Sequence, residues 1–347
     1  MSRLKRVDCS GPGILRRRRG RGFEYLDEKG KRVTEPSVIA RIEELAIPPA
    51  WEQVWICPYP MGHIQATGVD AAGRKQYRYH DAWRERRDQR KFDSMLDFGR
   101  SLPRVRERVE SDLRKRTMTR ERVLACAVRL LDRGFFRIGS EDYAEENDTY
   151  GIATMKKRHV DLNGGVVRFD YETKGGKRRV QSLRDPAVYR VVSELKRRRG
   201  GGDGLLAYKR DGRWADVKSI DINAYVKEAT GGDFSAKDFR TWNATLLTAV
   251  ALAVSGRAAT SKTARKRAIR RAVEEAARYL GNTPAVCRAS YIDPRVFDRF
   301  EGGLTIGGVL PELLEGDEDW PALHGDVEEA VLDLIEGAES PALEKVA

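Results

Sequence analysis

The chain has 347 residues, of which 40% are hydrophobic and 34% charged, and its 65 Lys and Arg against 53 Asp and Glu give a net charge of +12. This length predicts two domains with cores large enough to fold without disulfides or metals. The sequence has no apolar run of the about 18 residues that span a bilayer, no P-loop motif, no cysteine spacing typical of a zinc site or disulfide framework, and no apolar core of a secretory signal after the Arg-rich residues 1–22.

Residues 1–80 predict a small β-rich unit, because short β-branched and aromatic runs alternate with Gly, Pro and Asp turns. A short helix is expected at residues 39–45 and a polar helical connector at residues 81–92. The run Arg16-Arg17-Arg18-Arg19 is predicted to be a disordered arm that adds nonspecific affinity for phosphates. The expected strands are residues 22–25, 54–58, 64–68 and 74–80.

The pattern after the connector is mostly helical, with a three-stranded insertion. Leu124, Val128, Leu131 and Phe135 recur at the spacing of one face of an amphipathic helix. The insertion is expected to pair residues 158–162 and 166–171 across Asn163-Gly164-Gly165, a hairpin signal, and to continue through a turn at 173–176 into residues 178–183. Helices are expected to resume near Pro186, with Ser261 as an N-cap, Gly281 as a C-cap, and Thr283-Pro284 at the start of the next helix.

Charge is segregated along the chain. Residues 312–347 contain twelve acidic residues and one Lys, a net charge of −11, so residues 1–311 carry +23. A positive body of this size favours nucleic acid as the partner, although a soluble protein with solvated basic faces has the same composition. The acidic segment predicts either a packed helix or an arm that competes with DNA. The residues that recur at helical spacing in it are Val327, Val331, Leu334 and Ile335.

Four residues stand out by type and setting. Arg137 ends an apolar helix, Lys174 lies in the turn between two expected strands, Arg240 lies in the segment KDFRTW, and Tyr291 follows a helix break at Asn282. Each has an ordinary structural explanation when taken alone: a snorkelling cation, a solvated turn lysine, an ion-paired arginine and a half-buried core tyrosine.

Together, in this order and spacing, these segments resemble the type IB DNA topoisomerases of the short poxvirus and bacterial kind. The resemblance extends over about residues 23 to 300. It is carried by residues 73–79 (GRKQYRY), 135–139 (FFRIG) with Tyr143, 155–160 (MKKRHV), Lys174, 237–241 (KDFRT), and 280–284 (LGNTP) leading to Ser290-Tyr291.

The resemblance implies an enzyme in which Tyr291 attacks a backbone phosphodiester of duplex DNA, forming a 3′-phosphotyrosyl link and releasing a 5′-hydroxyl. In this reading Arg137 and Arg240 neutralise the non-bridging oxygens, and Lys174 is the general acid for the leaving oxygen. The enzyme–DNA link retains the bond energy, so resealing is expected to need no ATP, no metal and no other cofactor.

At Asn282 the family usually has a histidine. An Asn amide can donate the same hydrogen bond to a phosphate oxygen but cannot titrate, so Asn282 is predicted to be a transition-state donor rather than an acid.

By the same resemblance, Gln76, Tyr77 and Tyr79 on one strand contact DNA: the glutamine through base edges, the tyrosines through phosphates or bases. Tyr143 is a further DNA-contact candidate. The alternative makes Tyr77 and Tyr79 core aromatics with hydroxyls at the rim.

The chain is thus expected to be an α+β protein that clamps duplex DNA. Its parts are a β-rich DNA-binding domain (1–90), a mainly α-helical catalytic domain with a three-stranded β insertion (91–311), and an acidic segment (312–347). It is expected to relax supercoils as a cytoplasmic, nucleoid-associated monomer with no membrane partner. One alternative is a tyrosine recombinase, which usually has histidine where this chain has Lys237. The other is a DNA-binding architectural protein without catalysis.

Overall fold

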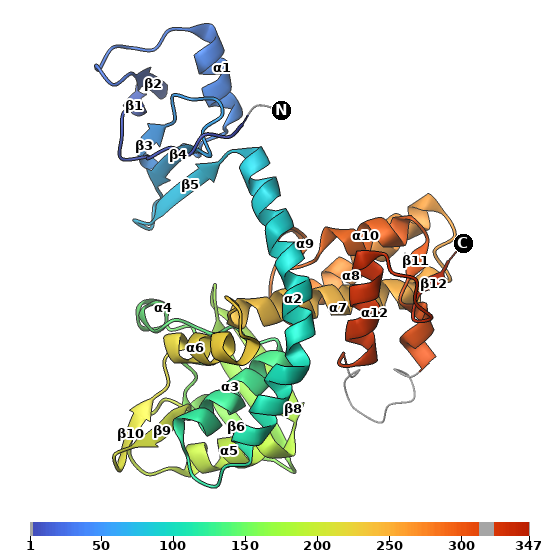
Figure 1. The fold of residues 1–347 in the computed structure, drawn as a ribbon. Coiled ribbons are helices and arrows are strands. Elements are labelled where there is room, and N and C mark those ends of the chain that lie inside the picture. The colour runs from blue at the N-terminus through green and yellow to red at the C-terminus, as the bar shows by residue number, and fades with distance from the viewer. Residues whose placement is uncertain (1–2, 312–322, 347) are drawn as a thin grey trace. The chain divides into compact units, whose positions relative to one another are not determined.

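The computed structural model describes residues 3–311 and 323–346, without the side chains of Asp142 and Tyr143. The chain divides into two compact units, Met1–Asp93 and Ser94–Ala347, and the division falls within helix α2 (Asp81–Leu113) (Figure 1). The first unit is β-rich and the second is mainly helical.

The first unit is built on a five-stranded antiparallel sheet with the strand order β2-β1-β3-β4-β5. Helix α1 (Pro36–Glu44) packs on it through Ile42, and the core also contains Ile14, Val54, Ile56 and Ala66. The predicted strands and short helix are confirmed. The strands are β1 (Ile14–Arg19), β2 (Gly22–Leu26), β3 (Glu52–Ile56), β4 (Ile64–Val69) and β5 (Lys75–Tyr79).

The prediction that residues 16–19 form a disordered arm is wrong, because these arginines are part of β1 and pair with β2. The Arg16 guanidinium donates to the carbonyls of Ile47 (3.2 Å), Pro48 (3.0 Å) and Trp51 (2.6 Å). Arg17 forms a 2.7 Å ion pair with Glu24 on the neighbouring strand. This run of arginines is therefore held in place by partners distant in the sequence, although composition alone predicts that it extends into solvent.

In the second unit, α3 (Arg120–Gly134) starts at Thr119, whose side chain accepts a hydrogen bond from the Arg122 amide. The helix ends at Gly134, so Phe135 does not continue the predicted helical face. Phe135 has left-handed backbone angles (φ 54°) and turns the chain toward Arg137. The short helix α4 (Glu141–Asn147) follows.

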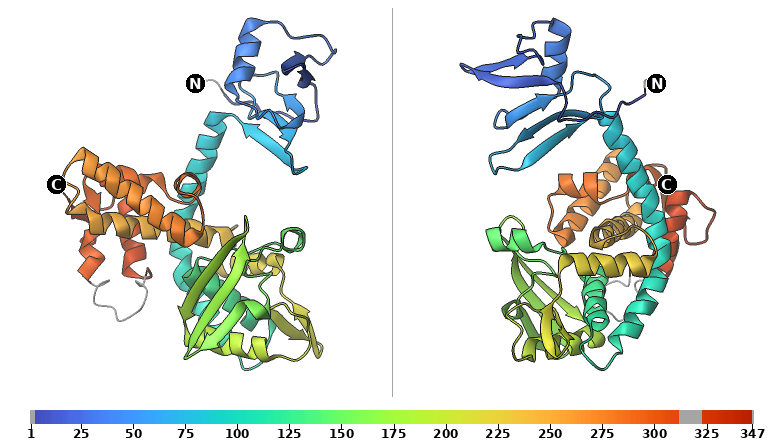
Figure 2. Two further views of the ribbon diagram at one scale, coloured as in Figure 1. Left: turned by 180° about the vertical axis from the view of Figure 1, so that it is seen from behind. Right: turned by 60° about the vertical axis from the view of Figure 1, so that its left-hand side comes forward.

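The three-stranded insertion is confirmed as an antiparallel sheet in the order β6-β7-β8. Its strands are β6 (Val160–Asn163), β7 (Val166–Thr173) and β8 (Lys177–Arg184). Gly164 and Gly165 both have positive φ, as the tight turn between β6 and β7 requires. The buried face of β7 packs toward α3 and α5 (Pro186–Arg197) (Figure 2).

The remaining helices pack around α7 (Ala236–Gly256), which is buried along most of its length. Helices α8 (Lys262–Leu280), α10 (Pro294–Glu301) and α12 (Asp326–Glu336) contact α7. The predicted caps are confirmed: Ser261 and Thr283 accept amide hydrogen bonds at two helix starts, and Gly281 (φ 64°) ends α8. The other elements are α6 (Ser219–Thr230), α9 (Pro284–Ser290), β9 (Ala207–Arg210), β10 (Arg213–Asp216), β11 (Leu304–Thr305), β12 (Glu344–Lys345) and the 3₁₀ turns η1 (Lys157–His159) and η2 (Gly307–Val309).

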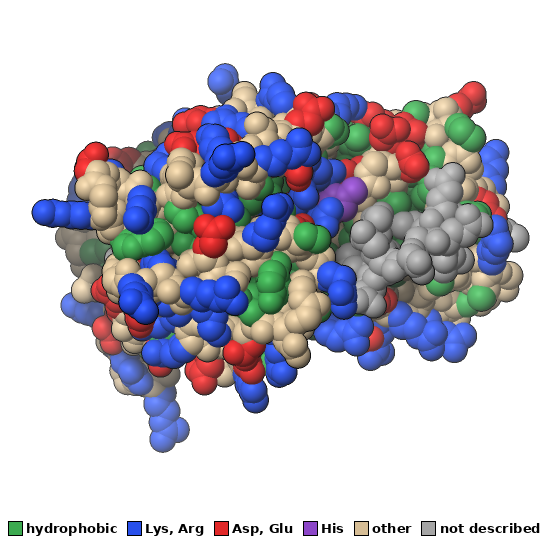
Figure 3. Space-filling view, turned by 90° about the horizontal axis from the view of Figure 1, so that it is seen from below, with side chains coloured by type: hydrophobic (Ala, Val, Ile, Leu, Met, Phe, Trp, Pro, Cys, Tyr) green, Lys and Arg blue, Asp and Glu red, His purple; other side chains and the backbone are tan. Residues whose placement is uncertain are grey.

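The acidic segment is predicted to be either a packed helix or an arm that competes with DNA, and the part of it that forms α12 is a packed helix. Val327, Val331, Leu334 and Ile335 are all buried. Residues 312–322 lie outside the described part of the chain. No helix among the described residues is long and apolar enough to cross a bilayer. On the face drawn in Figure 3, Lys and Arg side chains are spread among acidic and apolar ones.

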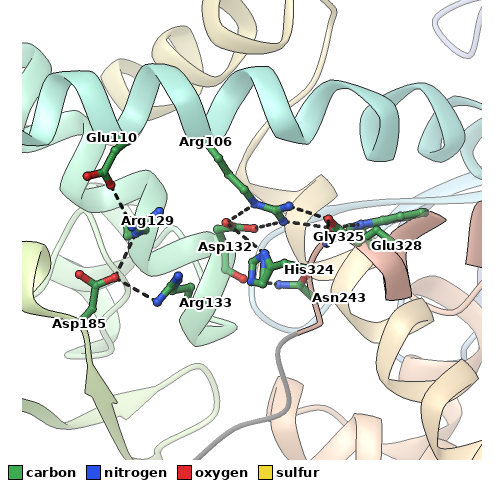
Figure 4. A network of polar contacts seen from close by, with 11 residues as sticks. Arg106, Glu110, Arg129, Asp132, Arg133, Asp185, Asn243, His324, Gly325 and Glu328 are labelled. Atoms are coloured by element: carbon green, nitrogen blue, oxygen red, sulfur yellow. Dashed lines mark hydrogen bonds and ion pairs between the residues drawn. The ribbon is translucent and has the colours of Figure 1, made fainter. Parts of the chain in front are cut away.

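A buried ionic network joins α12 to the rest of the unit (Figure 4). The Arg106 guanidinium of α2 donates to Asp132 of α3 (2.9 Å) and to Glu328 of α12 (2.9 Å). Glu328 also accepts from Trp242 Nε1 of α7 (3.0 Å). Burial acts to raise the pKa of the Asp132 carboxyl, but the charge and hydrogen bonds of Arg106 outweigh burial and hold that pKa below its ordinary value.

Replacing Arg106 by Ala is expected to lower the free energy of unfolding by about 3–5 kcal/mol at neutral pH, because two buried carboxylates lose their shared cation. The native pKa of Asp132 is depressed, so this stabilisation is complete above the unfolded pKa of about 3.9 and is lost as the pH falls below it. Denaturant unfolding at neutral pH and at about pH 3 measures both effects.

The matched control is Arg114→Ala. Arg114 directly follows the same helix, but its side chain is 74% exposed and pairs with Glu110 of the helix at 3.3 Å. Its loss is expected to change the free energy of unfolding by less than about 1 kcal/mol. Equal losses in the two variants would contradict the assigned role of Arg106.

Candidate active site

Four of the five predicted catalytic residues meet in the second unit. The Arg240 guanidinium lies 5.3 Å from the centre of the Tyr291 ring. Arg137 donates to the Asn282 side-chain oxygen and to the Gly281 carbonyl (3.2 Å). Lys174, the fifth, lies exposed in the turn between β7 and β8.

Arg240 lies in the second turn of α7, whose start is fixed by Ser235 and Asp238 in a reciprocal capping arrangement. It is 3% exposed and donates to the carbonyls of Phe135 and Leu280, both at 2.7 Å. Burial, and then the charge of Arg137, lower the pKa of Arg240 to about 10. The guanidinium therefore remains a cation at neutral pH.

Arg137 is held by a short pairing of its segment with residues 151–153. The Ile152 amide donates to the Arg137 carbonyl (2.9 Å), and the Ala153 amide donates to the Ile138 carbonyl (2.7 Å). This approach needs glycine at position 151, because a Cβ there would lie 2.7 Å from the Arg137 carbonyl oxygen.

Three arginines cap the C-terminal end of α8. Arg179 donates to the Tyr279 carbonyl (2.5 Å), Arg240 to the Leu280 carbonyl (2.7 Å), and Arg137 to the Gly281 carbonyl (3.2 Å). The last carbonyls of a helix have no intrahelical donors and carry the negative end of its dipole. The end of α8 thus gathers three cations around one point.

Sequence reasoning missed Arg179, which lies on β8 opposite Tyr171 of β7. Composition does not distinguish it from its neighbour Arg178, which is exposed and paired with Asp170. The signal that could have identified it is the alternation of inward and outward side chains along the predicted hairpin. Tyr171 faces the core, and its cross-strand partner must lie on the same face.

The Asn282 side chain uses its oxygen but not its amide nitrogen. Asn282 Oδ1 accepts from Arg137, whereas the buried Nδ2 has no acceptor among the described residues. A buried donor without an acceptor is costly, so this nitrogen is a candidate donor to a ligand oxygen.

Tyr291 is the C-cap residue directly after α9. Its amide donates to the Cys287 carbonyl (2.9 Å), and its own carbonyl accepts from Thr245 Oγ1 (3.4 Å). The ring is half-buried. The nearby Cys287 is buried, and burial raises the pKa of its thiol to about 11. At neutral pH that thiol is protonated and a poor nucleophile.

The predicted DNA-contact residues of the first unit lie on β5, which pairs only with β4 at the edge of the sheet. Tyr77 is 42% exposed, and its ring stacks on Tyr79 with 6.0 Å between ring centres. Gln76 Nε2 donates to Asp70 (2.8 Å). Tyr79 is partly buried against a second apolar cluster of this unit, formed by Trp55, Cys57 and Ile64, as the alternative prediction expected. Tyr77 does not belong to this cluster. The Tyr143 side chain lies outside the described residues.

Within the described part of the chain, no three His, Cys, Asp or Glu side chains gather closely enough to hold a metal ion. All four cysteines are free thiols.

Comparison with known proteins gives two family matches. Residues 80–301 match the family described as eukaryotic DNA topoisomerase I, catalytic core. Residues 22–70 match the family described as bacterial DNA topoisomerase IB, N-terminal domain. The two matches fall largely on the second and first units, respectively.

Individual relatives carry related names. The DNA topoisomerase 1B of Acanthamoeba polyphaga mimivirus is 33% identical over 287 residues, which cover 81% of this chain and 85% of that protein. The DNA topoisomerase 1B of Vaccinia virus is 23% identical over 121 residues, 34% of this chain and 38% of that protein. The DNA topoisomerase 1 of Daucus carota is 28% identical over 130 residues, 37% of this chain and 15% of that protein.

Proposed function

The chain belongs to the type IB DNA topoisomerase family, and from this premise we propose that it relaxes supercoiled duplex DNA without ATP. One strand is cut, the duplex swivels about the intact strand, and the cut is resealed. The observation that carries this proposal is the family match over residues 80–301. The groups proposed to carry out the reaction are those that lie together near the end of α8: Arg137, Arg240, Asn282 and Tyr291.

In the proposed reaction the Tyr291 oxygen attacks the phosphorus and releases the 5′-oxygen. A Tyr–phosphate bond forms, the bond to the 5′-oxygen breaks, the phenol loses its proton, and the leaving oxygen gains one. Arg137 and Arg240 donate to the non-bridging oxygens. In the complex the phosphate oxygens replace the carbonyls of Gly281 and Leu280 as the acceptors of these two arginines. Hydrogen bonds to a charged phosphate are stronger than those to neutral carbonyls.

Lys174 is proposed to be the general acid for the leaving 5′-oxygen. The lysine begins a three-residue turn completed by Gly175 and Gly176, both with positive φ. An exposed turn of this kind can carry a lysine to a phosphate that lies beside the arginines.

Both units are proposed to contact the same duplex and form a clamp around it, and the enzyme is proposed to act as a monomer on the nucleoid. Gln76 and the stacked pair Tyr77 and Tyr79 would contact bases and phosphates from the first unit. Tyr143 would contact DNA from the second. The net charge of +23 on residues 1–311 would draw the duplex in.

Asn282→Ala is expected to slow single-turnover strand cleavage by about 10- to 1000-fold, the scale of losing one transition-state donor. The available amide nitrogen at this position supports the assignment. A suicide DNA substrate, which traps the covalent complex, measures the rate. A loss below about twofold would remove Asn282 from the site.

Relaxation of a supercoiled plasmid in EDTA without ATP tests the proposed function as a whole. The expected product is a ladder of relaxed topoisomers. A plasmid with two copies of a cleavage site distinguishes the recombinase alternative, which would exchange strands between the sites. Binding without relaxation and without an SDS-trapped adduct would favour an architectural protein.

A further inference from the structure

We propose that Arg179 is a positioning residue that holds the hairpin of Lys174 against the end of α8. The inference rests on the proposed function, in which Lys174 is the general acid. Arg179 lies on β8, five residues after Lys174, and belongs to none of the motifs on which the family resemblance rests.

The contacts of Arg179 join the hairpin to two helix ends. Its Nη2 donates to the Tyr279 carbonyl of α8 (2.5 Å), and its Nε donates to the Gln181 side chain. Gln181 in turn donates to the Gly134 carbonyl at the end of α3 (2.5 Å). Alternate residues of a strand share one face, so the inward face of β8 presents both side chains to these ends.

These helix ends carry the proposed catalytic groups. Gly134 lies three residues before Arg137, and Tyr279 lies three residues before Asn282. Fixing β8 at these two points therefore fixes the hairpin relative to the arginines and the amide that surround the phosphate.

The Arg179 side chain is packed into this position. A Cβ at Gly281 would lie 2.9 Å from Arg179 Nη1, so the guanidinium fills the space beside the end of α8. Burial lowers the pKa of Arg179, as does the charge of Arg137. An arginine near two other cations is unfavourable unless it is compensated, and here the carbonyl end of α8 compensates it.

The place of Arg179 along β8 links it to the turn. The last pair of the hairpin before the turn is Thr173 with Lys177. Lys177 and Arg178 are exposed, so Arg179 is the first residue of β8 after the turn that reaches the interior. Loss of its contacts would release this end of the hairpin while the apolar side chains of β7 keep the rest in place.

The test compares two suicide substrates that differ in one atom, the bridging 5′-oxygen or a sulfur in its place. With sulfur, the Tyr–phosphate bond forms, the phosphorus–sulfur bond breaks, and the thiolate leaves without a proton, because thiols ionise at about pH 8.5. A defect in proton delivery is therefore seen with oxygen and disappears with sulfur. Lys174→Ala is the reference for that pattern.

Arg179→Ala is expected to cleave the oxygen substrate about 10- to 100-fold more slowly than the unaltered protein and the sulfur substrate within about threefold. Arg179→Lys, which retains the charge but not the fork of donors, is expected to show the same pattern to a smaller degree. The matched control is Arg178→Ala, one residue away but exposed and paired with Asp170 (2.6 Å), and it should cleave both substrates at the normal rate.

Equal losses on the two substrates, or no loss, would overturn the role of Arg179. Should Arg179→Ala fail to fold in a thermal melt, Arg179→Lys decides by the same comparison. If Lys174→Ala cleaves the sulfur substrate as slowly as the oxygen substrate, Lys174 is not the general acid. That result contradicts the proposed role of Lys174 and is distinguishable from a failure of the role of Arg179.

Discussion

Tyr291→Phe is expected to abolish relaxation, with a loss of at least about 10⁴-fold, and to leave DNA binding unchanged. The substitution removes only the phenolic oxygen. The ring remains to pack against Arg240, whose guanidinium lies 5.3 Å from its centre. Plasmid relaxation and the yield of SDS-trapped covalent adduct measure the effect.

Tyr279→Phe is the matched control for this result. Tyr279 lies in the last turn of α8, and its backbone carbonyl, which Arg179 contacts, is kept in the variant. It should relax plasmid normally. Relaxation by both the unaltered protein and Tyr291→Phe would show that another nucleophile acts, and relaxation by neither would refute the mechanism.

Arg240→Ala is expected to slow cleavage by about 10³- to 10⁵-fold, the scale on which an arginine stabilises charge in phosphoryl transfer. The loss combines two effects. The phosphate oxygens lose a planar pair of donors, and the carbonyls of Phe135 and Leu280 lose theirs. Arg240→Lys should recover only part of the rate, because an ammonium cannot span both positions. Single-turnover cleavage gives the rates.

Folding must be separated from chemistry in this variant, since two buried carbonyls without donors cost about 1–3 kcal/mol each. Denaturant unfolding and DNA binding are measured in parallel. Arg257→Ala is the control: Arg257 follows α7, is 74% exposed and pairs with Glu344 at 3.0 Å, so both stability and cleavage should be nearly unchanged. Cleavage by Arg240→Ala within tenfold of normal would remove Arg240 from the site.

Local signals predicted the elements that local physics determines. The caps at Ser261, Gly281 and Thr283 were readable because each depends on a residue type and on its neighbours within one turn. The hairpin at Gly164-Gly165 was readable for the same reason. The ordered resemblance motifs predicted which residues would be catalytic candidates, and four of them lie together.

Features that depend on distant partners were not predictable. The acceptors of Arg16 lie 31 to 35 residues away, so the arginine run seemed a solvated arm. Arg179 reaches a carbonyl 100 residues away and cannot be told from Arg178 without the register of the strands. The backbone turn at Phe135 depends on the packing of this aromatic residue in the core.

The position of α12 has a practical consequence for truncation. A chain cut before residue 323 would shed not a solvating extension but part of the hydrophobic interior, including Val331 and Leu334. Trp242 would lose its acceptor, two residues from Arg240, and Arg106 would lose one of its two carboxylates. Despite its acidic composition, α12 is therefore part of the core that supports the catalytic unit.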